Sequence, residues 1–128
     1  MTRIASLFAI ALLTGCAALP NGATPAADGS TVSLGLGQST LLADNSLLTY
    51  TRLVNDSRCP PDVRCVWEGD AEIALQWRPA GGGAKELRLH TSTRIGSTSV
   101  RAGSRNITLL GLDRGTAPEA SLRIDRAD

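Results

Sequence analysis

Apolar and polar residues alternate with a period of two along most of the chain, which is typical of half-buried β-strands. No stretch shows the 3.6-residue periodicity and capping residues of a useful helix. Glycine, serine and threonine interrupt the runs every 8–12 residues or so, as in all-β domains. The predicted strands are centred on residues 32–36, 48–54, 73–78, 87–90, 107–112 and 122–125. We therefore expect an all-β fold, a single small antiparallel sandwich or barrel of about six to eight strands.

Three segments carry finer predictions. In residues 48–54, alternation places Leu48, Tyr50, Arg52 and Val54 on one face of the strand. Residues 107–112 are apolar on both faces, which favours a central strand, and the glycines of residues 79–84 predict a turn. Residues 91–104 are rich in Ser, Thr and Gly, so they form either a long loop or a weak edge strand.

The N-terminus has the pattern of an export signal. Arg3 precedes ten apolar residues, too few to span a ~30 Å hydrocarbon core but suited to a signal peptide. The run ends in Leu13-Thr14-Gly15-Cys16, which resembles the lipobox of bacterial lipoproteins. That resemblance implies cleavage after residue 15 and acylation of Cys16. Several acyl chains, at about 0.8 kcal/mol per buried CH₂, make such an anchor effectively permanent.

The resemblance also bears on location and domain boundaries. Ala17 stands where an Asp commonly retains lipoproteins in the inner membrane, so we expect an outer-membrane anchor facing the periplasm. Residues 16–30, rich in Ala, Pro and Gly, are interpreted as the lipidated cysteine and a flexible tether. Residues 1–15 are then the signal peptide, and residues 31–128 are the β-domain.

The cysteine count is informative because it is odd. Three cysteines would leave one thiol unpaired in an exported protein, but lipidation of Cys16 leaves Cys59 and Cys65 as a pair. A disulfide between them closes a seven-residue loop, stiffened further by Pro60 and Pro61. The alternative is a metal or redox site. Five intervening residues and a single histidine in the chain give that alternative little support.

The loop belongs to a wider pattern, Asp-Ser-Arg-Cys-Pro at residues 56–60, followed after four residues by Cys65-Val66-Trp67 and then Gly69 and Ala71. This pattern resembles one in small exported bacterial proteins, mostly lipoproteins of uncharacterised function. The resemblance implies a compact β-domain with this disulfide, and it transfers no catalytic residue. Glu68 departs from it, since a small residue is expected there.

Charge and side-chain chemistry argue against several function classes. The chain has 13 basic and 12 acidic residues, whereas nucleic-acid binding needs a dense basic surface, so no nucleic-acid partner is expected. No G-x-S-x-G motif is present. Alternation places the single histidine, His90, with Arg88 on the solvent face. We therefore expect no catalytic residues, no cofactor and no enzymatic activity.

Five acidic residues crowd residues 56–72, but two arginines lie among them. Local pairing of arginine with carboxylate is the favoured interpretation. The alternative is a divalent-cation site, for which carboxylates on a constrained loop are suitable ligands. Trp67 is interpreted as a core residue packed over the disulfide, and an exposed Trp67 would instead suit a binding hot spot. The candidate metal ligands are Asp62, Glu68, Asp70 and Glu72, and the candidate binding residues are Arg58, Trp67, Glu68 and Asp70.

Two function classes follow from these patterns. The first is a lipid-anchored binding module of the cell envelope that presents the disulfide loop to an envelope protein or glycan, as an inhibitor or an assembly factor. The second is an envelope protein that binds a divalent cation through residues 56–72.

Overall fold

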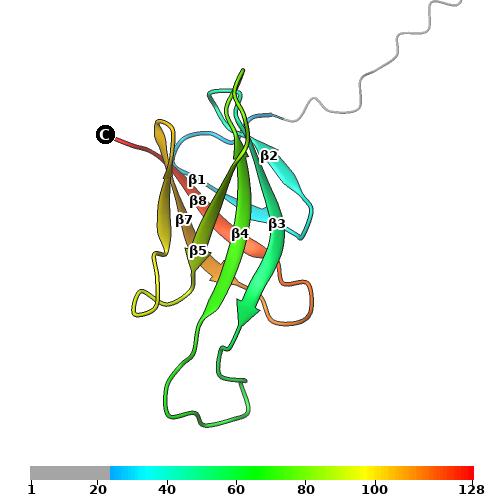
Figure 1. Ribbon diagram of the computed structural model, residues 1–128, viewed down its shortest axis with the longest axis vertical. Helices are drawn as coiled ribbons and strands as arrows, with labels where there is room; N and C mark the ends of the chain where they lie inside the picture. Colours follow the sequence, from blue (N-terminus) through cyan, green and yellow to red (C-terminus); the bar gives the residue numbers. More distant parts are fainter. Residues whose placement is uncertain (1–23) are drawn as a thin grey trace, which may run out of the picture.

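The computed structural model describes residues 24–128, which form a sandwich of two four-stranded antiparallel sheets (Figure 1). The predicted signal peptide and Cys16 lie outside the described residues. One sheet has the order β1-β8-β7-β6 and the other the order β2-β3-β4-β5. The all-β prediction is confirmed, with eight strands in the sandwich arrangement. The strands are β1 (Ser30–Leu34), β2 (Ser39–Leu41), β3 (Leu47–Asp56), β4 (Ala71–Arg78), β5 (Lys85–His90), β6 (Ser99–Ala102), β7 (Arg105–Leu112) and β8 (Ala120–Arg126).

The core lies between the two sheets. Most of its side chains are aliphatic, and two aromatic residues, Tyr50 and Trp77, are buried among them. In β4 the predicted alternation is confirmed for Ile73, Leu75 and Trp77, which are buried, and for Gln76 and Arg78, which are exposed. Ala74 departs from it, since it lies on the outer face with Gln76 but is buried. Full burial of each large aliphatic side chain stabilises the fold by about 1.5–3 kcal/mol. The opposite sheet contributes Leu34, Ile107, Leu109, Leu122 and Ile124.

A bulge in β3 overturns the face predicted for residues 48–54. The register pairs Tyr50 with Leu75 but Arg52 with Ala74, which leaves Thr51 as an extra residue. Since a bulge shifts the alternation by one position, Leu53 packs against the core and Arg52 points to solvent. The prediction that Arg52 shares the face of Tyr50 is therefore wrong.

The second sheet settles the remaining strand assignments. β7 lies between β8 and β6, as the apolar segment predicted, although a bulge after Leu109 leaves Leu110 55% exposed. Residues 91–98 form a loop and β6 follows as an edge strand, so both alternatives for residues 91–104 apply to part of the segment. No helix in the described part of the chain is long and apolar enough to cross a membrane.

The folded domain begins earlier than predicted. The Ala26 N–H donates to the carbonyl of Leu41 over 2.7 Å, and Asp28 forms an ion pair with the buried Arg105. β1 then starts at Ser30. The predicted tether is thus wrong for residues 26–30. Composition alone indicates flexibility there, but backbone hydrogen bonds and the ion pair with Arg105 hold this segment against the domain.

Candidate functional site

The segment between β3 and β4 protrudes from one end of the sandwich (Figure 1). We call residues 57–69 the disulfide loop. Cys59 and Cys65 are joined by a disulfide, with their Cα atoms 5.9 Å apart, so the predicted pairing is confirmed. The bridge closes the outer part of the loop on itself.

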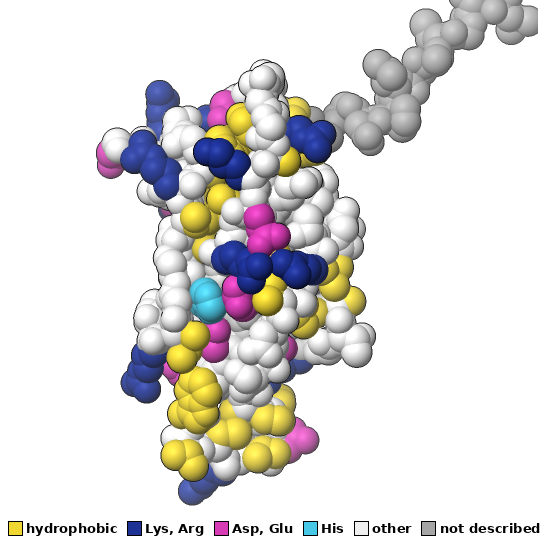
Figure 2. Space-filling view, viewed as in Figure 1, with side chains coloured by type: hydrophobic (Ala, Val, Ile, Leu, Met, Phe, Trp, Pro, Cys, Tyr) yellow, Lys and Arg dark blue, Asp and Glu magenta, His cyan; other side chains and the backbone are white. Residues whose placement is uncertain are grey.

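Apolar side chains cover the outer part of this loop. Val66 is fully exposed, Val63 is 56% exposed and Trp67 is 53% exposed. Figure 2 shows hydrophobic side chains gathered at this end of the molecule. We call Pro60, Pro61, Val63, Val66 and Trp67 the apolar tip.

The exposure of Trp67 corrects the sequence interpretation. Placing Trp67 in the core over the disulfide is wrong, because the loop has left the sheets before residue 67 and no core lies beneath it. The tryptophan that fills the core is Trp77, on the inner face of β4. The alternative expectation, an exposed Trp67, is what the structure shows.

Arg58 anchors the start of the loop to the rest of the domain. Its guanidinium donates to the Asp56 carboxylate from Nε over 2.8 Å and from Nη2 over 2.7 Å. It also donates over 2.6 Å to the backbone carbonyls of Leu112, the last residue of β7 in the opposite sheet, and of Asp113, which follows it. The hydrogen bonds from Arg58 hold the pKa of the Asp56 carboxyl below its ordinary value. The predicted local pairing of arginine with carboxylate is confirmed here.

The two chain segments at the base of the loop are hydrogen-bonded to each other. The Ser57 N–H donates to the carbonyl of Asp70 over 2.7 Å, and the Cys59 N–H donates to the carbonyl of Glu68 over 2.9 Å. Gly69 lies between them with φ of +75°. The antiparallel pairing of β3 and β4 therefore continues into the loop as far as the disulfide.

Asp70 joins the other end of the loop to residues 90–92. Its carboxylate accepts from the Ser92 N–H over 2.9 Å and from the Thr91 hydroxyl over 3.3 Å, and lies 2.7 Å from Nδ1 of His90. An ionised carboxylate only accepts, so Nδ1 carries the hydrogen. Only 6% of the Asp70 side chain is exposed, which makes this candidate binding residue a structural one.

His90 lies on the face opposite Leu89, as predicted, but it is not a solvent-facing residue. Its side chain is 19% exposed and is held between Asp70 and Glu72. Gly96 covers the ring so closely that a Cβ there would come within 2.1 Å of Cδ2. The prediction was wrong because the loop after β5 folds back over this face.

The Asp70 carboxyl makes stability depend on pH. Burial raises its pKa, but the hydrogen bonds from His90, Ser92 and Thr91 outweigh that effect and hold the pKa below its ordinary value of 3.8. A carboxyl whose pKa falls on folding stabilises the folded state above its unfolded pKa, and this contribution is lost as the pH falls through the folded value.

We therefore expect Asp70→Asn to be less stable than the wild type at neutral pH, with a difference that shrinks below about pH 4. Urea unfolding of both proteins at a series of pH values measures it. A difference that stays constant over that range would contradict the role assigned to the Asp70 carboxylate.

The acidic residues do not assemble into a metal centre. Asp70 is engaged by residues 90–92, and Glu72 is paired with Arg88 over 2.9 Å. Within residues 24–128, no group of three or more His, Cys, Asp or Glu side chains is placed to hold a metal ion. The structure thus does not bring together the side chains of the alternative ligand set, which was Asp62, Glu68, Asp70 and Glu72.

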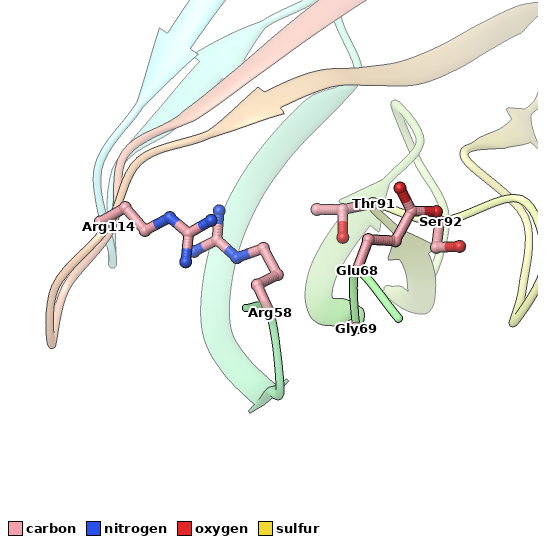
Figure 3. A pocket seen from close by; sticks show the side chains of 6 residues that line it. All are labelled: Arg58, Glu68, Gly69, Thr91, Ser92 and Arg114. Atoms are coloured by element: carbon pink, nitrogen blue, oxygen red, sulfur yellow. The ribbon is translucent and has the colours of Figure 1, made fainter. Parts of the chain in front are cut away.

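An open pocket of about 230 Å³ lies at the base of the loop. It is lined by Arg58, Glu68, Gly69, Thr91, Ser92 and Arg114. Figure 3 shows the guanidinium groups of Arg58 and Arg114 on one side and Glu68, Thr91 and Ser92 on the other. Of the predicted binding residues, Arg58 and Glu68 line this pocket, whereas Trp67 belongs to the apolar tip.

Sequence reasoning missed Thr91, Ser92 and Arg114. These residues come from the loops after β5 and after β7, which meet the disulfide loop only because both sheets end at the same edge of the sandwich. Their spacing along the chain carried no signal. Comparisons with protein-family models, with curated proteins and with solved structures find no match for this chain.

The hydrogen-bonded pair of Asp70 and His90 has the geometry of the orienting half of a nucleophilic triad. A triad also needs a hydroxyl or thiol on the other ring nitrogen. Among the described residues, the group found near Nε2 of His90 is the Glu72 carboxylate, at 4.0 Å. The pair of Asp70 and His90 thus joins the disulfide loop to the end of β5.

Proposed function

We propose that the protein is a lipid-anchored binding module of the bacterial cell envelope, and that it docks an envelope protein on the apolar tip of the disulfide loop. The observation that carries the proposal is the exposure of Val63, Val66 and Trp67 together on one protruding loop. Exposed contiguous apolar surface on a soluble domain is typical of an interaction site. Aromatic residues such as Trp67 are frequent binding hot spots.

The loop is held in shape before any partner arrives. The disulfide closes its outer part, two prolines restrict the backbone, and hydrogen bonds from Arg58 and to Asp70 fix both ends. A binding surface that is already ordered loses less conformational entropy on association, so more of the contact energy appears as affinity. Rigid protruding loops suit an inhibitor that inserts into a groove, and they also suit an assembly factor that positions a partner.

The chemistry of the tip favours a protein partner over a glycan. Val63, Val66 and the two prolines offer aliphatic surface without hydrogen-bonding groups, which complements an apolar protein groove. A sugar would instead need polar groups around an aromatic platform.

Capture from solubilised envelope membranes tests the tip. We expect the full chain to retain a specific protein that the double variant Val66→Ser, Trp67→Ser loses, with a drop in affinity of about 30-fold or more, as for a hot spot worth at least 2 kcal/mol. Leu47→Ser is the matched control, since Leu47 is also partly exposed, at 37%, but begins β3 at the opposite end of the strand from the loop. Equal retention by all three proteins would argue against the proposal.

Attachment to the membrane rests on the lipobox-like residues 13–16. We expect Cys16→Ser to move the protein from the membrane fraction to the soluble fraction, because the acyl chains have lost their attachment site. Membrane fractionation followed by mass spectrometry of the N-terminus measures this change. Unaltered fractionation of the variant would refute lipidation at this cysteine.

A further inference from the structure

We propose that the pocket at the base of the disulfide loop binds a zwitterionic small molecule of amino-acid size, with its carboxylate on Arg114 and its ammonium group on Glu68. This site is separate from the apolar tip and uses different side chains. The observation behind it is a pair of opposite charges that line the same pocket without pairing with each other.

The side of the pocket formed by Arg58 and Arg114, here called the cationic wall, has N–H groups without a hydrogen-bond partner among the described residues. Arg114 forms no ion pair and no side-chain hydrogen bond with any residue in the range 24–128. Arg58 beside it uses four of its N–H groups on Asp56, Leu112 and Asp113. One Nη1 hydrogen of Arg58 is left to add to the five of Arg114. A planar carboxylate matches this fork of donors.

The opposite wall is anionic. The Glu68 carboxylate makes no ion pair or side-chain hydrogen bond within the described chain, although its backbone carbonyl is engaged by Cys59. Beside it, the Ser92 hydroxyl accepts only a 3.3 Å hydrogen bond from the Arg94 N–H, and so retains capacity for another donor. The Thr91 hydroxyl, by contrast, is committed to Ala71 and Asp70. This wall is therefore suited to an ammonium group.

The two walls together select against ions of a single sign. A simple anion would be attracted by Arg114 but repelled by Glu68, and a simple cation would meet the reverse. A molecule with both charges satisfies both walls and leaves the net charge of the site unchanged. The volume of about 230 Å³ lies below the roughly 300–1,000 Å³ of sites for drug-sized ligands, which limits the occupant to about one residue in size.

Calorimetric titration of the purified full chain with glycine, β-alanine, γ-aminobutyrate and ε-aminohexanoate tests the site, because the series varies only the separation of the two charges. We expect one member to bind at least about tenfold more tightly than both propanoate and propylammonium. Arg114→Gln and Glu68→Gln should each weaken that binding about tenfold or more, since each removes a charged hydrogen-bonding partner.

Arg126→Gln is the matched control, because Arg126 is an exposed arginine at the end of β8 outside the pocket, and it should leave the affinity unchanged. Equal binding of propanoate would reveal a general anion site and overturn the proposal. Absence of binding by every member of the series, or binding that survives Arg114→Gln, would overturn it as well. None of these variants changes a residue of the apolar tip. Capture of a protein partner by the tip can therefore fail or succeed independently of small-molecule binding in the pocket.

Discussion

Replacing Gly69 by alanine is expected to lower the free energy of unfolding by about 2–5 kcal/mol. The backbone φ of +75° costs an L-residue about 1–2 kcal/mol. A Cβ at this position would also lie 2.0 Å from the carbonyl oxygen of Ser57, a contact that only a shift of the backbone relieves. Overpacking of this kind adds about 1–3 kcal/mol. Urea denaturation of the purified protein measures the loss.

Gly81→Ala separates the cost of the positive φ from the cost of the steric contact with Ser57. Gly81 has nearly the same φ, +73°, but no atom lies within 4 Å of a Cβ built there. We therefore expect this variant to lose only the backbone contribution, about 1–2 kcal/mol. If the two variants proved equally stable, the contact of a residue-69 Cβ with the Ser57 carbonyl would carry no cost, contrary to this prediction.

Replacing Arg58 by methionine should have the second large effect, a loss of about 2–4 kcal/mol. The change removes four hydrogen bonds and leaves the Asp56 carboxylate and the carbonyls of Leu112 and Asp113 without their partner. Only 11% of the Arg58 side chain is exposed, so water replaces these bonds poorly. Removing one member of a buried ion pair typically costs about 3–5 kcal/mol, and the partial exposure of Asp56, 22%, reduces that figure.

Arg88→Met is the matched comparison for Arg58→Met. Arg88 also contacts two carboxylates, those of Glu72 and Glu86, but its side chain is 43% exposed. Exposed ion pairs are worth about 0–1 kcal/mol, so this variant should be nearly as stable as the wild type.

A local readout distinguishes release of the loop from general destabilisation. Arg64 lies exposed within the disulfide loop, so limited trypsin digestion at this residue reports on loop order. We expect faster cleavage there in Arg58→Met than in Arg88→Met under conditions where both are folded. Identical cleavage rates would show that Arg58 does not hold the loop in place.

The disulfide loop is best described as an extension of the β3–β4 hairpin. Arg58 attaches it to the end of β7, and Asp70 attaches it to the loop after β5. In both attachments, the side chain of a charged residue forms hydrogen bonds with a segment that is distant in the sequence. The apolar tip therefore lies on a base that is anchored at both ends, as the proposed binding of a partner would require.

Local sequence patterns determined the chain's β-structure and its covalent constraint. Period-two alternation depends only on neighbouring residues, so β4 and β8 could be assigned from the order of their side chains. Once Cys16 was assigned to the lipobox-like motif, Cys59 and Cys65 remained as the predicted pair, and the structure contains that bridge. The pairing of Arg58 with Asp56, two residues apart, was equally within reach of local reasoning.

Only the tertiary structure decided which of these residues are buried. The extra residue Thr51 turned Arg52 to solvent and Leu53 to the core. The loop after β5 covered His90, and the protrusion of the disulfide loop exposed Trp67. Arg114 reached the pocket through the order of the strands. Alternation reports the direction of a side chain relative to its own strand. Whether solvent or another segment lies in that direction depends on how the two sheets and their end loops pack together.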